Sequence, residues 1–263
     1  MLNGYIGELR EIIVWCHGNP GGGSAKLAPV PEGLDYDRWL GQAPEIPFTE
    51  GRNNHDIWFH VSDYALGNIT SWGAHMLDIA LWGMGDKLSR TVEIQGQGTF
   101  PTGEGVRDTH ISWDVNCVFQ NGIKLNFFGG PINQMSYDNL RKRYGRTTFH
   151  GTAFEGTKGW VHVDRDGINA DPPSLLTVKI GANEVQLMQS TDHRRNFLDA
   201  VRTKSRTICP IDSAVQADLL CHLSDIATKV NGKLVWDFER ECFSDNDLAN
   251  RLLARAMRSP YEI

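Results

Sequence analysis

The sequence NITSWGAHMLDIALWGMG, residues 68–85, predicts a helix over 70–84 that is apolar on nearly all sides. Three polar residues, Ser71, His75 and Asp78, interrupt it at a spacing that places them on one helical face. A buried polar group without a partner costs about 1–3 kcal/mol, so this stripe needs partners in the protein or a ligand. What His75 and Asp78 act on is therefore the first functional question.

The segments around this helix predict the fold class. Alternating, β-branched runs indicate strands at 8–16, 91–100, 110–119, 123–130, 146–156, 159–168 and 175–181. The turns QNG (120–122) and GTKG (156–159) are typical of antiparallel hairpins. Further helices are expected at 34–41, 192–204 and 212–230, with a short one inside 244–263. This order predicts an α+β fold, a large and mostly antiparallel sheet with helices packed on one face.

Composition and charge exclude several classes of partner. The 263 residues are 40% hydrophobic and 22% charged, as in ordinary soluble globular proteins. The net charge is −6, and the basic run RKRYGR (141–146) is interpreted as a solvated strand end, so no nucleic-acid partner is expected. The cysteines form no C-x-x-C pair and are predicted to be reduced, mostly buried thiols; they are Cys16, Cys117, Cys209, Cys221 and Cys242.

Localisation follows from two expected absences. No secretory signal opens the chain, since MLNGYIGELREIIVW places acids inside the region that would have to be apolar. No apolar run approaches the ~20 residues that cross a bilayer. A cytoplasmic protein without a membrane partner is therefore expected.

Two long loops precede the helix. Residues 17–33 contain GGG without the G-x-G-x-x-G spacing, and no helix opens straight after it, so a surface loop is expected rather than a phosphate cradle. Residues 42–67 lack periodicity but are rich in aromatic side chains, which indicates an ordered loop that carries polar groups toward a site.

Three interpretations of the polar stripe stay open on the residues alone. His75 can be a core histidine bonded to a backbone carbonyl, with Asp78 holding a neighbouring loop. It can line a substrate pocket as an acid, a base or a hydroxyl ligand, since the pKa of histidine suits proton transfer. It can bind a metal with His55 or His60, although their spacing is poor for ligands. A Ser-His-Asp triad is rejected because the chain has no G-x-S-x-G.

At this helix the chain resembles the D-x-G-x-H-x-x-D segment in the C-terminal substrate domain of the Gfo/Idh/MocA oxidoreductases. Other segments are similar to motifs of that family in the same order: NGYIGELREIIVW (3–15), PVPEGLDYDRWLGQAP (29–44), FEGTKGWVHV (154–163), HRRNFLDAVRTKSRTICPID (193–212) and DNDLANRLLARAMRSPY (245–261). The resemblance implies that residues 1–263 form a single domain of this type. The sequence shows neither the G-x-G-x-x-G nor the E-K-P motif of the family's dinucleotide-binding domain.

The resemblance also implies site residues. His75 matches the histidine that faces the reacting hydroxyl, and Asp78 matches the later acid of the motif; both are expected to be catalytic. Ser71 stands where many members have an acid, which removes a possible proton relay. The expected lining of the substrate pocket comprises Arg52, Asn54, Trp58, His60, Ser71 and Trp72. No cofactor-binding or metal-binding residue is identified.

The function implied is the substrate-binding and oligomerisation half of an NAD(P)-dependent sugar or polyol oxidoreductase. Hydride transfer needs the nicotinamide about 3–3.5 Å from the substrate carbon, so the chain alone is not expected to catalyse it, and a Rossmann domain must supply NAD(P). One alternative is a carbohydrate-binding or scaffold protein without redox activity. A less favoured one is a cofactor-independent sugar hydrolase or lyase with His75 as base, since glycoside cleavage usually needs two carboxyl groups.

A second copy of the chain is also an expected partner. In the family the sheet face without helices commonly pairs with another subunit. An uncovered face rich in aromatic side chains would aggregate, which favours oligomerisation. The aromatic residues expected on this face are Trp113, Phe119, Phe127, Phe128, Phe149 and Trp160.

Overall fold

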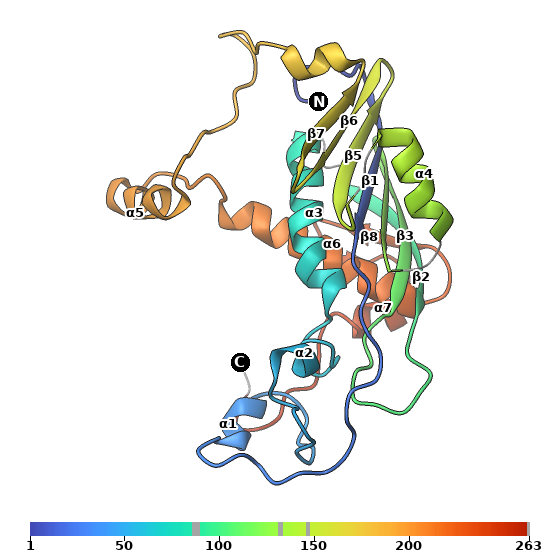
Figure 1. Cartoon of the computed structure of the whole chain (residues 1–263), viewed down its shortest axis with the longest axis vertical. Helices are drawn as coiled ribbons and strands as arrows, with labels where there is room; N and C mark the ends of the chain where they lie inside the picture. Colours follow the sequence, from blue (N-terminus) through green and yellow to red (C-terminus); the bar gives the residue numbers. More distant parts are fainter. Residues whose placement is uncertain (86–89, 131–133, 146–147, 262–263) are drawn as a thin grey trace.

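The computed structural model describes residues 1–85, 90–130, 134–145 and 148–261, without the side chains of 134–136 (Figure 1). Its strands are β1 (Leu9–Cys16), β2 (Thr91–Thr99), β3 (Ser112–Phe119), β4 (Lys124–Gly129), β5 (Gly151–Gly156), β6 (Gly159–Asp164), β7 (Gly167–Asp171), β8 (Leu234–Asp237) and β9 (Cys242–Phe243). Its helices are α1 (Tyr36–Leu40), α2 (His55–Trp58), α3 (Asn68–Met84), α4 (Gln134–Tyr144), α5 (His193–Thr203), α6 (Ile211–Lys229) and α7 (Asp247–Arg251), with a 3-10 helix, η2, at Pro173–Thr177.

The strands form one nine-stranded sheet in the order β7-β6-β5-β1-β4-β3-β2-β8-β9. Among the described strand pairs, β1 and β4 run parallel and the others run antiparallel. The predicted α+β class, with a large and mostly antiparallel sheet, is confirmed. The position of β1 between β4 and β5 places the chain that follows it at the same end of the sheet as the start of β5.

Helices α3 and α6 pack side by side on one face of the sheet (Figure 1). Apolar residues of α3, among them Met76 and Leu77, are almost fully buried there. Glycines permit the close approach: a Cβ at Gly73 would lie 2.9 Å from the sulfur of Cys221, and one at Gly83 would overlap the ring of Phe154. The predicted helix is therefore the central element of the core.

Helix α4 covers part of the opposite face, and the sequence did not predict it. A second apolar cluster forms beneath it, composed of Trp15, Phe128, Leu140, Tyr144, Ala153 and Trp160. The basic run from Arg141 belongs to the last turn of α4, so its interpretation as a strand end was wrong; its residue 146 lies outside the described part. The helix is polar and contributes few apolar side chains to the sheet, which explains why periodicity missed it.

Most of the aromatic residues expected on an uncovered face are covered. Trp113, Phe119 and Phe127 are buried in the core under α3 and α6, whereas Phe128 and Trp160 lie under α4. Phe149, which precedes β5, is 67% exposed. The part of this face formed by β2, β3 and β4 carries mostly polar side chains, namely Glu93, Gln95, Gln97, Asp114, Asn116, Lys124 and Asn126. That face is open to solvent but polar.

Three smaller predictions are corrected. The run 175–181 is not a strand, because its first residues belong to η2. The side chains of Leu176 and Ile180 are 47% and 51% exposed, and no strand among the described residues pairs with this run. The run 159–168 is interrupted by a turn that separates β6 from β7. The pair β8 and β9 was not predicted, because each strand is very short.

Residues 17–66 form a lobe beyond one end of the sheet, and the C-terminal segment packs against it (Figure 1). The helix expected at 34–41 is present as α1: the Asp35 side chain caps its start by accepting from the Arg38 amide at 3.1 Å, and Gly41 ends it with φ 53°. The Arg258 guanidinium donates to Asp37 Oδ1 at 2.6 Å and to the Gly41 carbonyl at 2.9 Å. This arginine ties the C-terminal segment to α1.

All five cysteines are free, and Cys16, Cys117 and Cys221 are buried, as predicted. Over the described part of the chain, no helix combines the length and the apolar character that a bilayer span requires.

Candidate functional site

Helix α3 presents His75 to solvent at the edge of a cavity of about 360 Å³. The walls come from α3, the turn between β6 and β7, and the start of α6 with the residues before it: Ala74, His75, Asp78, Ile79, Arg165, Cys209, Ala214 and Ala217. The interpretation of His75 as a buried core histidine is therefore wrong. The charged or titratable oxygen and nitrogen groups of this cavity belong to His75, Asp78 and Arg165.

Asp78 lies one turn from His75 and is half-buried. Burial raises the pKa of its carboxyl group, and the neighbouring His75 opposes the rise only in part. Its Oδ1 is buried and has no hydrogen-bond partner among the described residues. Since a desolvated acceptor without a donor is costly, this carboxyl can gain from a ligand that brings a hydroxyl or N–H group.

Trp72 is the centre of a cluster of basic side chains. Its ring lies 5.4 Å from the ring of His17, 5.9 Å from that of His75 and 4.5 Å from that of His150, measured between centroids. The guanidinium carbon of Arg165 lies 5.9 Å from the Trp72 ring centre. The tryptophan thus connects the cavity with the end of the sheet where β1 stops and β5 starts.

The ring of His150 is the most enclosed of the three histidines around Trp72. Both of its nitrogens are buried without a hydrogen-bond partner in the described part of the chain. Burial lowers the pKa of His150, and the neighbouring His17 and Arg165 lower it further. The neutral imidazole therefore carries an unused donor and an unused acceptor next to Trp72.

Sequence reasoning missed His17, His150 and Arg165. His17 directly follows β1 and His150 directly precedes β5. These strands are far apart in the sequence, and the pairing of Trp15 with Gly151 brings the two histidines together. A signal for this would have required the strand order, which local patterns do not contain. Ser71 and Trp72, which were predicted, lie on α3 with His75.

The four candidates from the preceding loop lie in the lobe. Arg52 is buried and donates to Thr49 Oγ1 at 3.1 Å and to the Tyr64 hydroxyl at 3.0 Å, so its charge supports the lobe itself. Trp58 lines a different cavity, of about 330 Å³, together with Trp39 and Tyr64.

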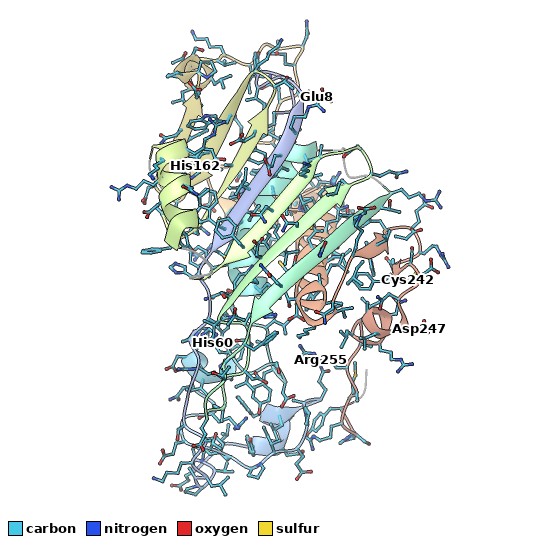
Figure 2. All side chains as sticks on the ribbon, turned by 90° about the vertical axis from the view of Figure 1, so that its right-hand side faces the viewer. Glu8, His60, His162, Cys242, Asp247 and Arg255 are labelled. Atoms are coloured by element: carbon cyan, nitrogen blue, oxygen red, sulfur yellow. The ribbon has the colours of Figure 1, made fainter. Side chains whose placement is uncertain are left out.

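The other two of these candidates differ in exposure. Asn54 is exposed and precedes α2. His60 is buried at the junction with the sheet (Figure 2), and burial, aided by Arg107, lowers its pKa to about 4. None of the four is among the described residues that line the His75 cavity, so their role as sugar ligands stays a prediction.

The model of an oxidoreductase family's C-terminal alpha/beta domain, that of Gfo/Idh/MocA, matches residues 13–132 and 145–263. The chain belongs to the Gfo/Idh/MocA oxidoreductase family. The resemblance inferred from the helix and the flanking motifs is thereby confirmed, and the matching part is the family's C-terminal domain. A search of curated protein sequences found no significant match.

Solved structures of similar fold include an NAD-binding protein from Listeria innocua, with 16% identity, a TM-score of 0.49, and coverage of 87% of this chain and 56% of that one. The WlbA dehydrogenase from Bordetella pertussis, solved with NADH and UDP-GlcNAcA, has 13% identity and a TM-score of 0.49, with 88% and 55% coverage. An oxidoreductase from Agrobacterium radiobacter, solved with NAD+, L-tartaric acid and magnesium, has 11% identity and a TM-score of 0.45, with 91% and 59% coverage. This Gfo/Idh/MocA chain thus spans little more than half the length of these proteins.

The described elements of this Gfo/Idh/MocA domain do not fit a dinucleotide. Binding of NAD(P) typically uses a glycine-rich turn between a strand and the N-terminus of the next helix. Here β1 leads into a long loop, and the glycines 21–23 lie well before the start of α1 at Tyr36. Within the described ranges, no three His, Cys, Asp or Glu side chains gather closely enough to hold a metal ion.

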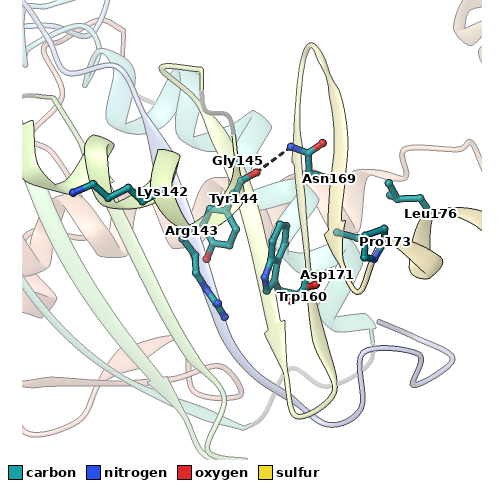
Figure 3. A pocket seen from close by; sticks show the side chains of 10 residues that line it. Lys142, Arg143, Tyr144, Gly145, Trp160, Asn169, Asp171, Pro173 and Leu176 are labelled. Atoms are coloured by element: carbon teal, nitrogen blue, oxygen red, sulfur yellow. Dashed lines mark hydrogen bonds between the residues drawn. The ribbon is translucent and has the colours of Figure 1, made fainter.

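A larger cavity, of about 530 Å³, lies on the other side of the sheet between α4, β6 and β7 (Figure 3). Its main polar groups already have partners. The Arg143 guanidinium binds Glu155 through two contacts of 3.0 and 3.1 Å, and the Asn169 amide donates to the Tyr144 carbonyl at 3.0 Å. These bonds anchor α4 to the sheet, so the His75 cavity is the better candidate for a functional site.

Proposed function

We propose that this Gfo/Idh/MocA domain binds a sugar or polyol in the His75 cavity and forms the substrate half of an NAD(P)-dependent oxidoreductase. The observation that carries the proposal is the exposed imidazole of His75 in the same cavity as the half-buried carboxyl of Asp78, whose Oδ1 has no hydrogen-bond partner among the described residues. A cavity of about 360 Å³ is within the size range of small-molecule sites. Hydroxyl groups suit both side chains, since they can donate to one and accept from the other.

The chemistry assigned to this chain is the handling of a proton. Oxidation of an alcohol to a carbonyl removes the hydroxyl proton as well as a hydride, and a neutral imidazole at His75 can accept that proton. Asp78 lies beside it and can orient the sugar by accepting from a second hydroxyl. NAD(P) would accept the hydride and would be held by a Rossmann domain, since the described residues do not fit it.

An apolar surface beside the cavity supports such a docked domain. Phe197, Leu198 and Val201 of α5 are 57%, 56% and 64% exposed, and Val215 of α6 is 57% exposed. Val215 follows Ala214, which lines the cavity, so the α6 part of this surface adjoins the candidate site. A cofactor domain that reaches the substrate would cover it, either as a separate subunit or as another segment of the same polypeptide.

A second copy of the chain is proposed on the open sheet face. This face is extended and polar, and the Asn126 amide donates there to Asp114 Oδ1 at 2.7 Å and to Asn116 Oδ1 at 3.0 Å. If two copies pair through this face, analytical ultracentrifugation is expected to show a dimer. Asn116→Arg should convert the dimer to a monomer, since two opposed arginines would repel. An unchanged mass for the variant would place the pairing elsewhere.

A second candidate is a carbohydrate-binding or scaffold protein without redox activity. It needs the His75 cavity alone and no dinucleotide. Calorimetric titration of the chain with NAD+, with NADP+ and with a sugar panel separates the candidates. Sugar binding without cofactor binding is expected for both candidates. Dehydrogenase activity that appears when a Rossmann subunit is added would select the oxidoreductase. A cofactor-independent hydrolase or lyase predicts turnover without nucleotide that His75→Ala abolishes.

Cys209 provides a test of the site itself, because it is exposed and lines the cavity. A bound sugar is expected to slow alkylation of Cys209 and to leave Cys242, which lies in β9 (Figure 2) and does not line the cavity, unaffected. His75→Gln should remove the protection without changing the alkylation rate of the free protein. Equal alkylation rates with and without every sugar of the panel would contradict the proposal.

A further inference from the structure

Arg165 is held in a fixed place at the entrance of the site. It lies in the short turn between β6 and β7, where Asp164 Oδ1 accepts the amides of Asp166 and Gly167 at 2.9 and 3.0 Å. Asp164 is 8% exposed, so a buried carboxylate stabilises this turn. Because this turn is already ordered, binding of a ligand by the Arg165 side chain costs little further backbone conformational entropy.

The guanidinium of Arg165 has no ion pair or hydrogen bond with any described residue, unlike the guanidinium groups of Arg143, Arg195 and Arg258. Arg143 binds Glu155, Arg195 binds Asp199 and Arg258 binds Asp37. Arg165 instead lies over the Trp72 ring, with its guanidinium carbon 5.9 Å from the ring centre. It lines the same cavity as Asp78 but forms no salt bridge with it.

The charged groups around the Arg165 guanidinium permit an anion to bind there. His17 and His150 pack on the Trp72 ring beside it, and Arg165 contributes to the lowered pKa of His150. Three carboxyl groups lie in the same region, on the sequence neighbours Asp164 and Asp166 and on Asp78 of the cavity. Asp164 binds the turn, the pKa of Asp78 is raised by burial, and Asp166 is exposed to water.

We infer that the substrate is an acidic sugar, whose carboxylate or phosphate binds the Arg165 guanidinium while a ring hydroxyl lies at His75. This inference rests on the proposed function of the cavity and specifies its substrate class. A guanidinium presents paired N–H donors that match both oxyanions in a bidentate geometry. The cation–π contact with Trp72 holds the guanidinium near the ring, and its N–H groups have no acceptor among the described residues.

The test measures the affinity of the full chain for matched sugars by calorimetry, with D-glucuronate, D-glucose 6-phosphate and neutral D-glucose as probes. One or both acidic sugars are expected to bind about 10- to 100-fold more tightly than glucose, and more weakly as salt is raised. Arg165→Gln should remove that preference and leave the affinity for glucose unchanged, and Arg165→Lys should retain part of it. Arg10→Gln, at an exposed position in β1, is the matched control and should change nothing.

Each outcome decides between the claims. A preference for glucuronate identifies a carboxylate ligand, and a preference for glucose 6-phosphate identifies a phosphate ligand. Glucose binding that protects Cys209 equally well, with no effect of Arg165→Gln, overturns the inference and leaves the proposed function standing. Failure of all three sugars, and of neutral polyols, to bind or protect Cys209 overturns both.

Discussion

A buried histidine outside the candidate site gives the most quantitative prediction about stability. His110 precedes β3 and is 1% exposed. Its Nε2 lies 2.6 Å from Thr228 Oγ1, and its Nδ1 lies 3.7 Å from Asp225 Oδ1, so the ring joins the sheet to α6. Burial lowers the pKa of His110 to about 4; Asp225 opposes this shift and Lys229 adds to it.

The sign of the pH effect follows from that lowered pKa. The folded protein keeps His110 neutral down to about pH 4, whereas the unfolded chain binds a proton near its ordinary pKa of about 6.5. The resulting stability is complete above pH 6.5, is lost as the pH falls, and is gone near pH 4. The gap between the two pKa values corresponds to about 3 kcal/mol in the free energy of unfolding.

The assay is urea unfolding of the wild type and of His110→Gln at several pH values between 7.5 and 4, followed by tryptophan fluorescence. The variant is expected to be less stable at pH 7.5 but to lose about 3 kcal/mol less than the wild type on acidification. His60 has a similarly lowered pKa, but it is present in both proteins and cancels in the comparison. Parallel losses in the two proteins would refute the assignment of this titration to His110.

Three further predictions concern packing, charge and the lobe. Gly83→Ala should lower the free energy of unfolding by about 1–3 kcal/mol because its Cβ overlaps the Phe154 ring, and adding Phe154→Leu should restore part of the loss in urea unfolding. Asp78→Asn should raise the thermal midpoint at pH 7 but not near pH 3, since burial raises the pKa of Asp78 and penalises its charged form; no gain at pH 7 would contradict this. Arg258→Ala should speed proteolysis of residues 17–50, and an unchanged cleavage pattern would show that its bonds do not hold the lobe.

The sequence was a good guide to the fold wherever local pattern and burial agree. The helix around His75 is buried through a continuous apolar surface, and the long strands alternate, so both were predicted with nearly correct limits. Helix α4 was missed because Leu140 and Tyr144 are among its few apolar contacts. The run 175–181 was wrongly predicted to be a strand, since its β-branched residues have no strand to pair with among the described residues.

The candidate site was predicted only in part, for a physical reason. His75, Asp78 and Trp72 share one helix, so spacing along the sequence was enough to group them. Arg165 and His150 reach the same place through the pairing of β5 with β1 and β6, and such long-range pairing is not encoded in any local motif. Of the loop residues that were grouped with His75, Arg52 supports its own lobe, as its bonds to Thr49 and Tyr64 show.

The imidazole signal of His75 reports most directly on whether sugars bind where this account places them. In a protein labelled with carbon-13 histidine, His75 is assigned by the signal that His75→Gln lacks, and a sugar that binds by calorimetry is then titrated. We expect the His75 signal to shift and saturate at the calorimetric affinity, while the signal of His110, enclosed beneath α6, stays in place. A sugar that binds at that affinity without moving the His75 signal would contradict the central claim.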